Sequence, residues 1–204
     1  MSEYAMFPLG AVVFPFTAVP LRVFEPRYQH LLDDVMAGDR TFGTVLIERG
    51  SEVGGGDERF DVGTVVQVAS VGRLPEEDHR QIIVAGLSRF RVDGWLGEDP
   101  YPRAEVEPWP DDDEPVSPEL LTETGEWLRR VLALASELGA DTAEIRTELS
   151  DDPVTASYQA AALTPVSALD DYALLTAPGP ASRLRLCIEM LGDTADQLNR
   201  RLSE

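Results

Sequence analysis

Four prolines interrupt an otherwise apolar segment near the N-terminus and restrict how that segment can fold. Residues 7–28 read FPLGAVVFPFTAVPLRVFEPRY, with prolines at positions 8, 15, 20 and 26. A proline fixes its own φ and has no N–H for a sheet ladder, so it suits the start, the edge or a bend of a strand. We therefore expect Pro8 and Pro15 to bracket a first strand, with a second strand opening at a bend at Pro20. Pro26 is expected to begin a helix.

Most of the first half of the chain is predicted to be β-strand. In SRFRVDGW, residues 88–95, charged residues alternate with Phe90, Val92 and Gly94, which is the period of a strand with one solvated face. Residues 62–74 and 80–86 are β-branched runs separated by a polar turn. About six to eight short strands with short connections predict a mostly antiparallel barrel or sandwich.

One helix is expected within this β-rich half, directly after Glu25. Pro26 suits the first helical position, and Gly38 ends the pattern. Apolar residues recur between them at i, i+3, i+4, i+7 and i+8, namely Tyr28, Leu31, Leu32, Val35 and Met36. The helix should therefore lie with its apolar face on the sheet.

The second half of the chain is predicted to be helical. The expected helices cover residues 118–138, 141–149, 153–163, 165–176 and 180–202. Their starts are marked by Ser117, Asp152 and Thr164, each followed by proline, and by a capping box of Asp141 with Glu144. The expected organisation is a β-rich subdomain over 1–110, an acidic, proline-rich linker over 111–119, and an α-helical bundle subdomain over 120–204.

The net charge of the chain excludes two classes of partner. There are 37 acidic and 17 basic residues, for a formal charge of −20. Nucleic acids and anionic membranes are bound by cationic side chains, so we expect neither as a partner. The chain has no apolar run of about 18 residues and no secretory signal pattern. Its single cysteine, Cys187, cannot form an internal disulfide, and together these features predict a cytoplasmic protein.

The residues needed for catalysis are scarce. All 17 basic residues are arginine, and the missing lysine excludes a P-loop, a Ser–Lys dyad and Schiff-base chemistry within this chain. His30 and His79 lack the spacing of a metal site or a triad, and Cys187 lies on the apolar face of a predicted helix. The acidic run at 111–114 lacks the ligand spacing of a calcium loop and is expected to be a solvated linker. We therefore expect no catalytic residues, no cofactor and no metal.

Two blocks of the sequence resemble the N-terminal domain of the Lon protease family. The first block follows the family pattern P-L, F-P and P-L-x-V-F-E-x-R through Pro8, Leu9, Phe14, Pro15, Pro20, Leu21, Val23, Phe24, Glu25 and Arg27. The second block, residues 62–92, resembles the family's G-T strand, R-L-P hairpin and G-x-x-R-F-R-V strand. Residues 158–191 are similar to the family's helical bundle, so the resemblance covers about residues 6–192.

The resemblance implies both a fold and a role. The fold would be α+β, with a PUA-like antiparallel β pseudobarrel carrying one helix, followed by an α-helical bundle. The role would be that of a substrate-recognition module, which binds unfolded or tagged polypeptides or a partner protein and is not an enzyme. Because the sequence ends at Glu204 and has no lysine, we expect a stand-alone form without the family's ATPase and peptidase modules.

Several apolar residues are candidates for the contact surface of such a module. Exposed apolar patches commonly bind partners or peptides. We expect Phe14, Phe16, Pro20, Tyr28 and Trp95 to contribute to it. Glu25 and Arg89, charged members of the two blocks, are predicted to pair between the helix start and the sheet.

Two alternative functions remain open at the level of the sequence. One is a small-molecule hydrolase or transferase that uses a pocket between barrel and bundle. The other is a regulatory adaptor of a separate ATP-dependent protease. The sequence leaves the bound ligand and the oligomeric state undetermined.

Overall fold

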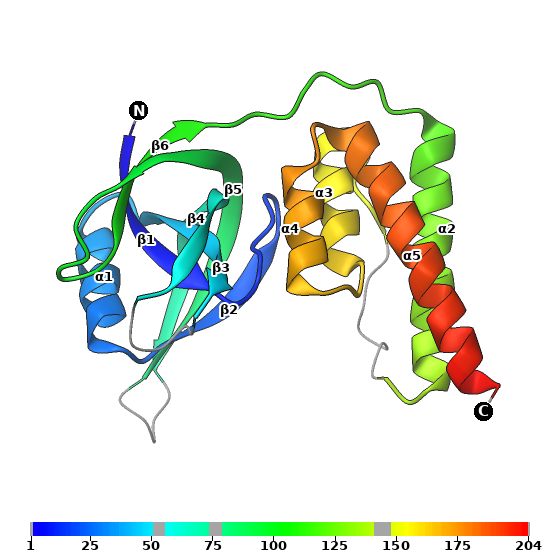
Figure 1. The fold of residues 1–204 in the computed structure, drawn as a ribbon, viewed down its shortest axis with the longest axis horizontal. Coiled ribbons are helices and arrows are strands. Elements are labelled where there is room, and N and C mark those ends of the chain that lie inside the picture. Colours follow the sequence, from blue (N-terminus) through cyan, green and yellow to red (C-terminus); the bar gives the residue numbers. More distant parts are fainter. Residues whose placement is uncertain (1, 51–55, 74–78, 141–147, 204) are drawn as a thin grey trace. The chain divides into compact units, whose positions relative to one another are not determined.

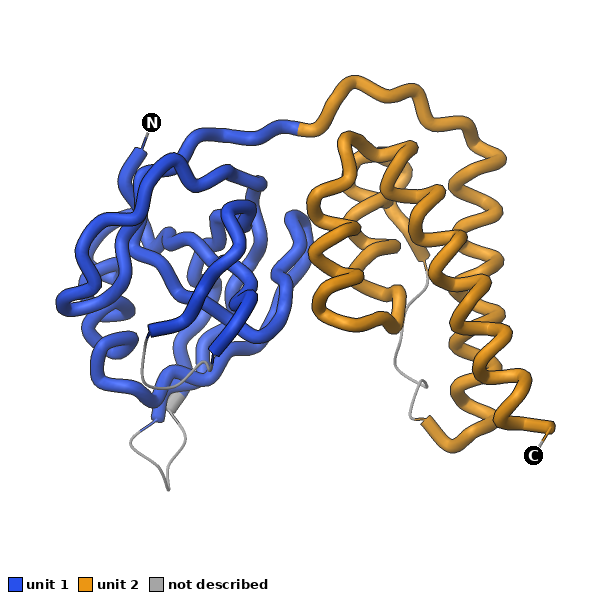
Figure 2. Tube along the Cα trace, viewed as in Figure 1, with its two compact units in different colours: residues 1–110 blue, residues 111–204 orange. Residues whose placement is uncertain are grey.

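The computed structural model describes residues 2–50, 56–73, 79–140 and 148–203. The chain divides into two compact units, Met1–Pro110 and Asp111–Glu204, shown in blue and orange in Figure 2. The described part of the first unit holds all the strands and α1, and that of the second holds the remaining helices (Figure 1). No helix within the described ranges is both long enough and apolar enough to cross a bilayer.

The first unit is built on a six-stranded mixed sheet. Its strands are β1 (Ser2–Leu9), β2 (Ala18–Val23), β3 (Thr41–Arg49), β4 (Glu58–Arg73), β5 (Arg80–Trp95) and β6 (Arg103–Pro108). Their order is β2-β5-β4-β3-β1-β6, and β6 also pairs with the C-terminal half of β5, which curls the sheet into an open pseudobarrel. The α+β architecture of a curled sheet with one helix, followed by helices, is confirmed.

One strand pair corrects the expectation of an antiparallel sheet. β1 and β3 are parallel, with Phe7 opposite Thr44 and Leu9 opposite Leu46, whereas the other strand pairs in the described part are antiparallel. A tight hairpin joins antiparallel neighbours, but a long crossover allows a parallel pair. The crossover here contains β2 and α1 (Pro26–Ala37), which return the chain so that β3 runs in the direction of β1.

The helix α1 begins and ends where the sequence predicts. Pro26 is its first residue, and Gly38 caps its C-terminus. Tyr28, Leu31, Leu32 and Val35 are buried on the sheet in one cluster with residues of β1, β3, β4 and β5. The ring of Tyr28 stacks on the ring of Phe7 with centroids 4.1 Å apart. Burial of this apolar face is what holds α1 against the sheet.

Three of the four prolines, Pro8, Pro15 and Pro20, occupy different places from those expected. Pro8 lies inside β1, opposite Val45 of β3, and Pro20 lies inside β2, opposite Ile83 of β5. Pro15 is buried in the connection between those strands, so the expected strand from Pro8 to Pro15 is wrong. Both strand prolines are tolerated because β2 is an edge strand and because β6 covers β1 only at residues 2–5.

The second unit consists of helices α2 (Pro118–Glu137), α3 (Pro153–Leu163), α4 (Ala168–Thr176) and α5 (Pro180–Leu202). The predicted caps at Ser117 and Asp152 are confirmed, since their side chains accept hydrogen bonds from the N–H groups of Leu120 and Thr155. The prediction of a helix over 141–149, with its Asp141–Glu144 capping box, falls largely outside the described residues; Glu148 and Leu149 are not helical.

The predicted start of α4 at Thr164 is wrong. Thr164 ends α3, where its hydroxyl donates to the carbonyl of Ala160 at 2.8 Å. The helix α4 begins at Ala168, and Ser167 forms a capping box with Asp170. The Thr164 hydroxyl is therefore engaged with the preceding helix and cannot cap the next one.

A buried polar cluster connects the acidic segment after residue 110 to the helices of the second unit. The Arg183 guanidinium is fully buried and donates to the Asp111 carboxylate at 2.6 Å, the Ser157 hydroxyl at 2.8 Å and the Leu174 carbonyl at 3.0 Å. It lies 3.6 Å above the ring centroid of Tyr158, whose hydroxyl is also hydrogen-bonded to Asp111. The start of the stretch expected to be a solvated linker is therefore bound to α5.

Candidate functional site

Among the residues that the structure describes, His30, His79 and Cys187 do not come together in one site. His30 is exposed on α1, and the His79 ring lies 5.6 Å from the ring of Phe24. Cys187 is fully buried in α5, and burial raises the pKa of its thiol to about 12, which keeps it protonated. Within the described ranges, no group of three or more His, Cys, Asp or Glu side chains could hold a metal ion.

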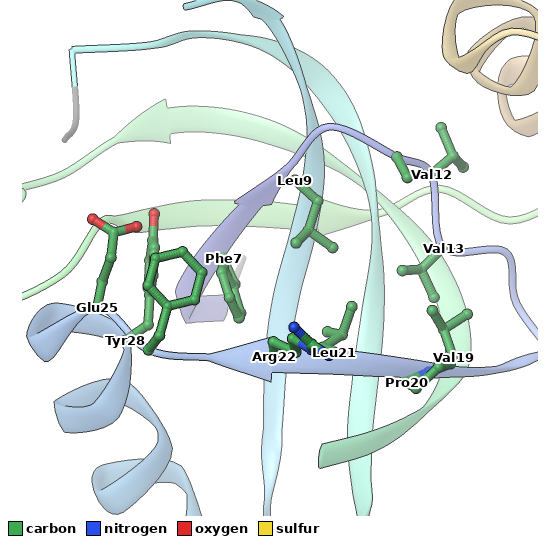
Figure 3. Close-up of a pocket in the computed structure, with 12 residues that line it drawn as sticks. Phe7, Leu9, Val12, Val13, Val19, Pro20, Leu21, Arg22, Glu25 and Tyr28 are labelled. Atoms are coloured by element: carbon green, nitrogen blue, oxygen red, sulfur yellow. The ribbon is translucent and has the colours of Figure 1, made fainter. Parts of the chain in front are cut away.

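One feature that can bind a ligand is an apolar pocket of about 360 Å³ in the first unit (Figure 3). It lies among β1, the connection that follows β1, β2 and the start of α1. Its lining residues are Phe7, Leu9, Ala11, Val12, Val13, Val19, Pro20, Leu21, Arg22, Phe24, Glu25 and Tyr28. We call this the β1–β2 pocket.

The strand period explains why the β1–β2 pocket is apolar. Phe7 and Leu9 alternate along β1, and Val19 and Leu21 alternate along β2, so each pair projects to one face of its strand. Phe7 and Leu9 belong to the core cluster, against which Val19 and Leu21 are partly buried. The β1–β2 pocket is therefore continuous with the hydrophobic core.

Two charged residues, Arg22 and Glu25, are among the residues that line the pocket. The Glu25 carboxylate lies 3.3 Å from Nε of Arg27, and the Arg27 guanidinium lies 4.5 Å from the centroid of the Tyr28 ring. Burial raises the pKa of the Tyr28 hydroxyl to about 12, so Tyr28 is a neutral wall of the pocket at physiological pH. The arrangement can bind an apolar group and offers no acid–base pair for catalysis.

Two of the five predicted contact residues, Pro20 and Tyr28, line the β1–β2 pocket. Phe14 is buried in the connection between β1 and β2, with 3% of its surface exposed. Phe16 is half-exposed in the same connection and does not line the pocket. Trp95 lies at the end of β5, where its ring covers the Arg59 guanidinium at 4.5 Å.

Glu25 and Arg89, which are predicted to pair with each other, each contact other groups in the structure. Glu25 is bonded to Arg27, as described above. Arg89 is 4% exposed and donates to the carbonyls of Trp109 at 3.2 Å and Pro110 at 3.3 Å, with its guanidinium over the Trp109 ring. These hydrogen bonds hold the end of the first unit, Trp109 and Pro110, against β5. The pairing of Glu25 with Arg89 stays a prediction.

Sequence reasoning missed most of the pocket's apolar wall. Phe7, Leu9, Val19 and Leu21 lie in the proline-rich segment of residues 7–28, but they were not among the predicted contact residues. The signal that could have found them is the alternation at 19, 21 and 23 around Pro20, which predicts an edge strand with one apolar face.

Comparison with known proteins finds similarity to one family of domains. Residues 3–193 match the family described as the ATP-dependent protease La (LON) substrate-binding domain. "Lon protease 2" of Sorangium cellulosum is 31% identical over 90% of this chain, and "Lon protease 1" of Herpetosiphon aurantiacus is 26% identical over 93%. The chain spans 23% and 24% of the lengths of these two relatives.

Solved structures have the same fold. The Lon N-terminal domain protein from Xanthomonas campestris superposes with a TM-score of 0.70 at 26% identity, covering 93% of this chain and 98% of that one. The N-terminal domain of the Mycobacterium avium complex Lon protease gives a TM-score of 0.67 at 17% identity, over 94% of this chain and 99% of that one.

Proposed function

The chain belongs to the family of ATP-dependent protease La (LON) substrate-binding domains, and on that premise we propose that it binds polypeptide segments without catalysing a reaction on them. Its ligands are unfolded or tagged polypeptides, or an exposed segment of a partner protein. The setting is the cytoplasm, which is consistent with the single, buried cysteine.

The observation that carries this proposal is the β1–β2 pocket. A pocket of about 360 Å³ bounded by Phe7, Leu9 and Leu21 can receive one large apolar side chain, and such pockets commonly span about 300–1,000 Å³. Burying one such side chain contributes about 1.5–3 kcal/mol, which alone improves Kd by about ten- to a hundredfold. A folded protein hides its large apolar side chains and an unfolded one exposes them, so the pocket distinguishes the two.

The proposal is tested by filling the pocket from its rim. Ala11 lines the pocket and is exposed, so Ala11→Trp places an indole at the opening with little effect on folding. The matched control is Ala162→Trp, which adds the same side chain at an exposed position of α3. The measurement is the fluorescence anisotropy of labelled casein, a chain with little tertiary structure, titrated with each protein.

We expect Ala11→Trp to weaken casein binding by about tenfold or more and Ala162→Trp to leave it unchanged, because only the former occupies the pocket. Thermal unfolding should be the same for both variants. Equal casein affinity of the three proteins would reject the β1–β2 pocket as the binding site, and an absence of casein binding by the unaltered protein would reject the function.

The two alternative functions stay predictions. A small-molecule hydrolase would turn over ester or phosphate substrates. An adaptor would co-purify with an ATPase. We favour the binding module because the described histidines and Cys187 do not meet in a site.

A further inference from the structure

The β1–β2 pocket has an apolar end and a polar end. Val12 and Val13, from the connection after β1, and Val19 of β2 line one end (Figure 3). Glu25 and Tyr28 line the other end, where α1 begins (Figure 3). A side chain that fills the pocket from end to end must therefore combine an apolar body with a polar tip.

One polar group at that end is the Tyr28 hydroxyl. Tyr28 is 3% exposed, and burial is the main cause of the rise in the pKa of its hydroxyl to about 12. Among the residues that the structure describes, none forms a hydrogen bond with this hydroxyl, whereas the Tyr101 hydroxyl donates to Asp34 at 2.7 Å. A buried hydroxyl without a hydrogen bond is unfavourable, so a ligand group that pairs with it gains affinity.

The Glu25 carboxylate is an acceptor at the same end of the pocket. Glu25 is the N-cap residue of α1 and Tyr28 is the third residue of that helix, so their side chains emerge close together. The carboxylate lies 3.3 Å from Nε of Arg27. Because a carboxylate can accept about four hydrogen bonds, Glu25 can accept from a ligand as well as from Arg27.

The charged side chains around the pocket favour a ligand group without charge. Arg22 and Glu25 line the pocket, and Arg27 is paired with Glu25. The two guanidiniums would repel a cationic tip, and the carboxylate would repel an anionic one. A neutral polar tip avoids both repulsions and can still form hydrogen bonds.

The walls beside the polar end are aromatic. Phe7, Phe24 and Tyr28 line the pocket, and the rings of Phe7 and Tyr28 stack with centroids 4.1 Å apart. An aromatic ring packed against other rings gains more than the burial of its area alone provides. The body of the ligand side chain that suits these walls is therefore an aromatic ring.

We propose, resting on the proposed function, that the β1–β2 pocket takes a tyrosine side chain of the bound polypeptide, whose hydroxyl donates to the Glu25 carboxylate and accepts from the Tyr28 hydroxyl. A phenol hydroxyl suits this end because it is neutral and can donate and accept at once. Leucine or phenylalanine would fill the apolar part and leave the Tyr28 hydroxyl without a partner. Tyr28 and Glu25 are thus the residues that set the preference.

The test uses the full chain and three nine-residue peptides labelled with fluorescein, which differ only at the central residue. That residue is tyrosine in the first peptide, phenylalanine in the second and O-methyltyrosine, which cannot donate, in the third. Serine and glycine flank it, so no other side chain is charged. Fluorescence anisotropy gives the Kd of each peptide for the unaltered protein and two variants.

The variants remove one hydroxyl each. Tyr28→Phe keeps the ring in the pocket and deletes the hydroxyl at its polar end. The matched control is Tyr4→Phe, because Tyr4 is half-buried against the other core cluster of the first unit and does not line the pocket. Tyr28→Phe should not lower the thermal unfolding temperature, since the deleted hydroxyl has no partner among the described residues.

We expect the unaltered protein to bind the tyrosine peptide about fivefold or more tightly than the phenylalanine peptide, as neutral hydrogen bonds provide. The O-methyltyrosine peptide should bind no more tightly than the phenylalanine peptide. In Tyr28→Phe the preference for tyrosine should shrink to about twofold, with the phenylalanine peptide bound at least as tightly as before. Tyr4→Phe should keep the full preference.

Each other outcome overturns a definite part of the reasoning. Equal binding of the tyrosine and phenylalanine peptides would refute the inference, while casein binding that Ala11→Trp weakens would leave the proposed function standing. A full preference in Tyr28→Phe, or an equal loss of it in Tyr4→Phe, would refute the part of the Tyr28 hydroxyl. Tight binding of O-methyltyrosine would refute donation to Glu25. Binding of casein without any peptide would refute the inference alone, and binding of neither would refute the proposed function with it.

Discussion

Removal of the Asp111 carboxylate tests how the segment after residue 110 is held to the helices of the second unit. In Asp111→Ala, the buried Arg183 guanidinium loses its partner at 2.6 Å, and the Tyr158 hydroxyl loses an acceptor at 3.1 Å. Arg183 keeps its bonds to Ser157 and to the Leu174 carbonyl, so its charge remains buried without a counter-charge from Asp111.

The expected loss of unfolding free energy is large for a single carboxylate. The side chain of Asp111 is 9% exposed and that of Arg183 is fully buried. Removing one partner of such a pair costs about 3–5 kcal/mol, because the remaining charge loses its counter-charge in a poorly solvated site. Removing both charges costs less, so Asp111→Ala combined with Arg183→Met should be less destabilised than Asp111→Ala alone.

The measurement is urea unfolding followed by circular dichroism at 222 nm, where the helices dominate the signal. The matched control is Asp113→Ala, which removes the same charge at an exposed position two residues away and should change stability by less than about 0.5 kcal/mol. A loss in Asp111→Ala equal to that of Asp113→Ala would refute the reasoning. So would a double variant whose loss equals the sum of the two single losses.

Three further predictions concern single positions. A Cβ at Gly86 would lie 2.1 Å from the Phe14 carbonyl oxygen, so Gly86→Ala should lower the unfolding free energy by about 3 kcal/mol in urea titrations, whereas Gly72→Ala should not. Phe14→Ala should cost about 3–5 kcal/mol in the same assay, and Phe16→Ala should cost far less because Phe16 is half-exposed; equal losses would contradict the burial. Burial raises the pKa of the Cys187 thiol to about 12, so iodoacetamide should label this thiol only after the protein unfolds. Labelling of the folded protein should not increase from pH 7 to pH 9, and rapid labelling of the folded protein would contradict the burial.

The helices show what short-range sequence patterns can predict. Ser117 and Asp152, each before a proline, mark the starts of α2 and α3, and Pro26 and Gly38 bound α1. A cap and a helical period are complete within a few residues, so they can be recognised without the rest of the fold. Thr164 shows the limit, because its hydroxyl bonds to the helix behind it.

The candidate site was predicted only in part. The proline-rich segment was identified as the distinguishing region, and Pro20 and Tyr28 of the five predicted contact residues line the β1–β2 pocket. Phe14 is buried beside it, and Trp95 covers Arg59 at the far end of β5. Side-chain exposure depends on what packs against each residue, and that is set by segments distant in the sequence.

By itself the sequence determined the class of fold, the positions of the capped helices and the absence of lysine chemistry from this chain. Only the tertiary structure decided that β1 and β3 are parallel and that Pro20 lies in an edge strand beside a pocket. The physical reason is that strand pairing joins residues far apart, such as Pro8 with Val45 and Pro20 with Ile83. No local pattern around a proline specifies which side of its strand will be left without a partner.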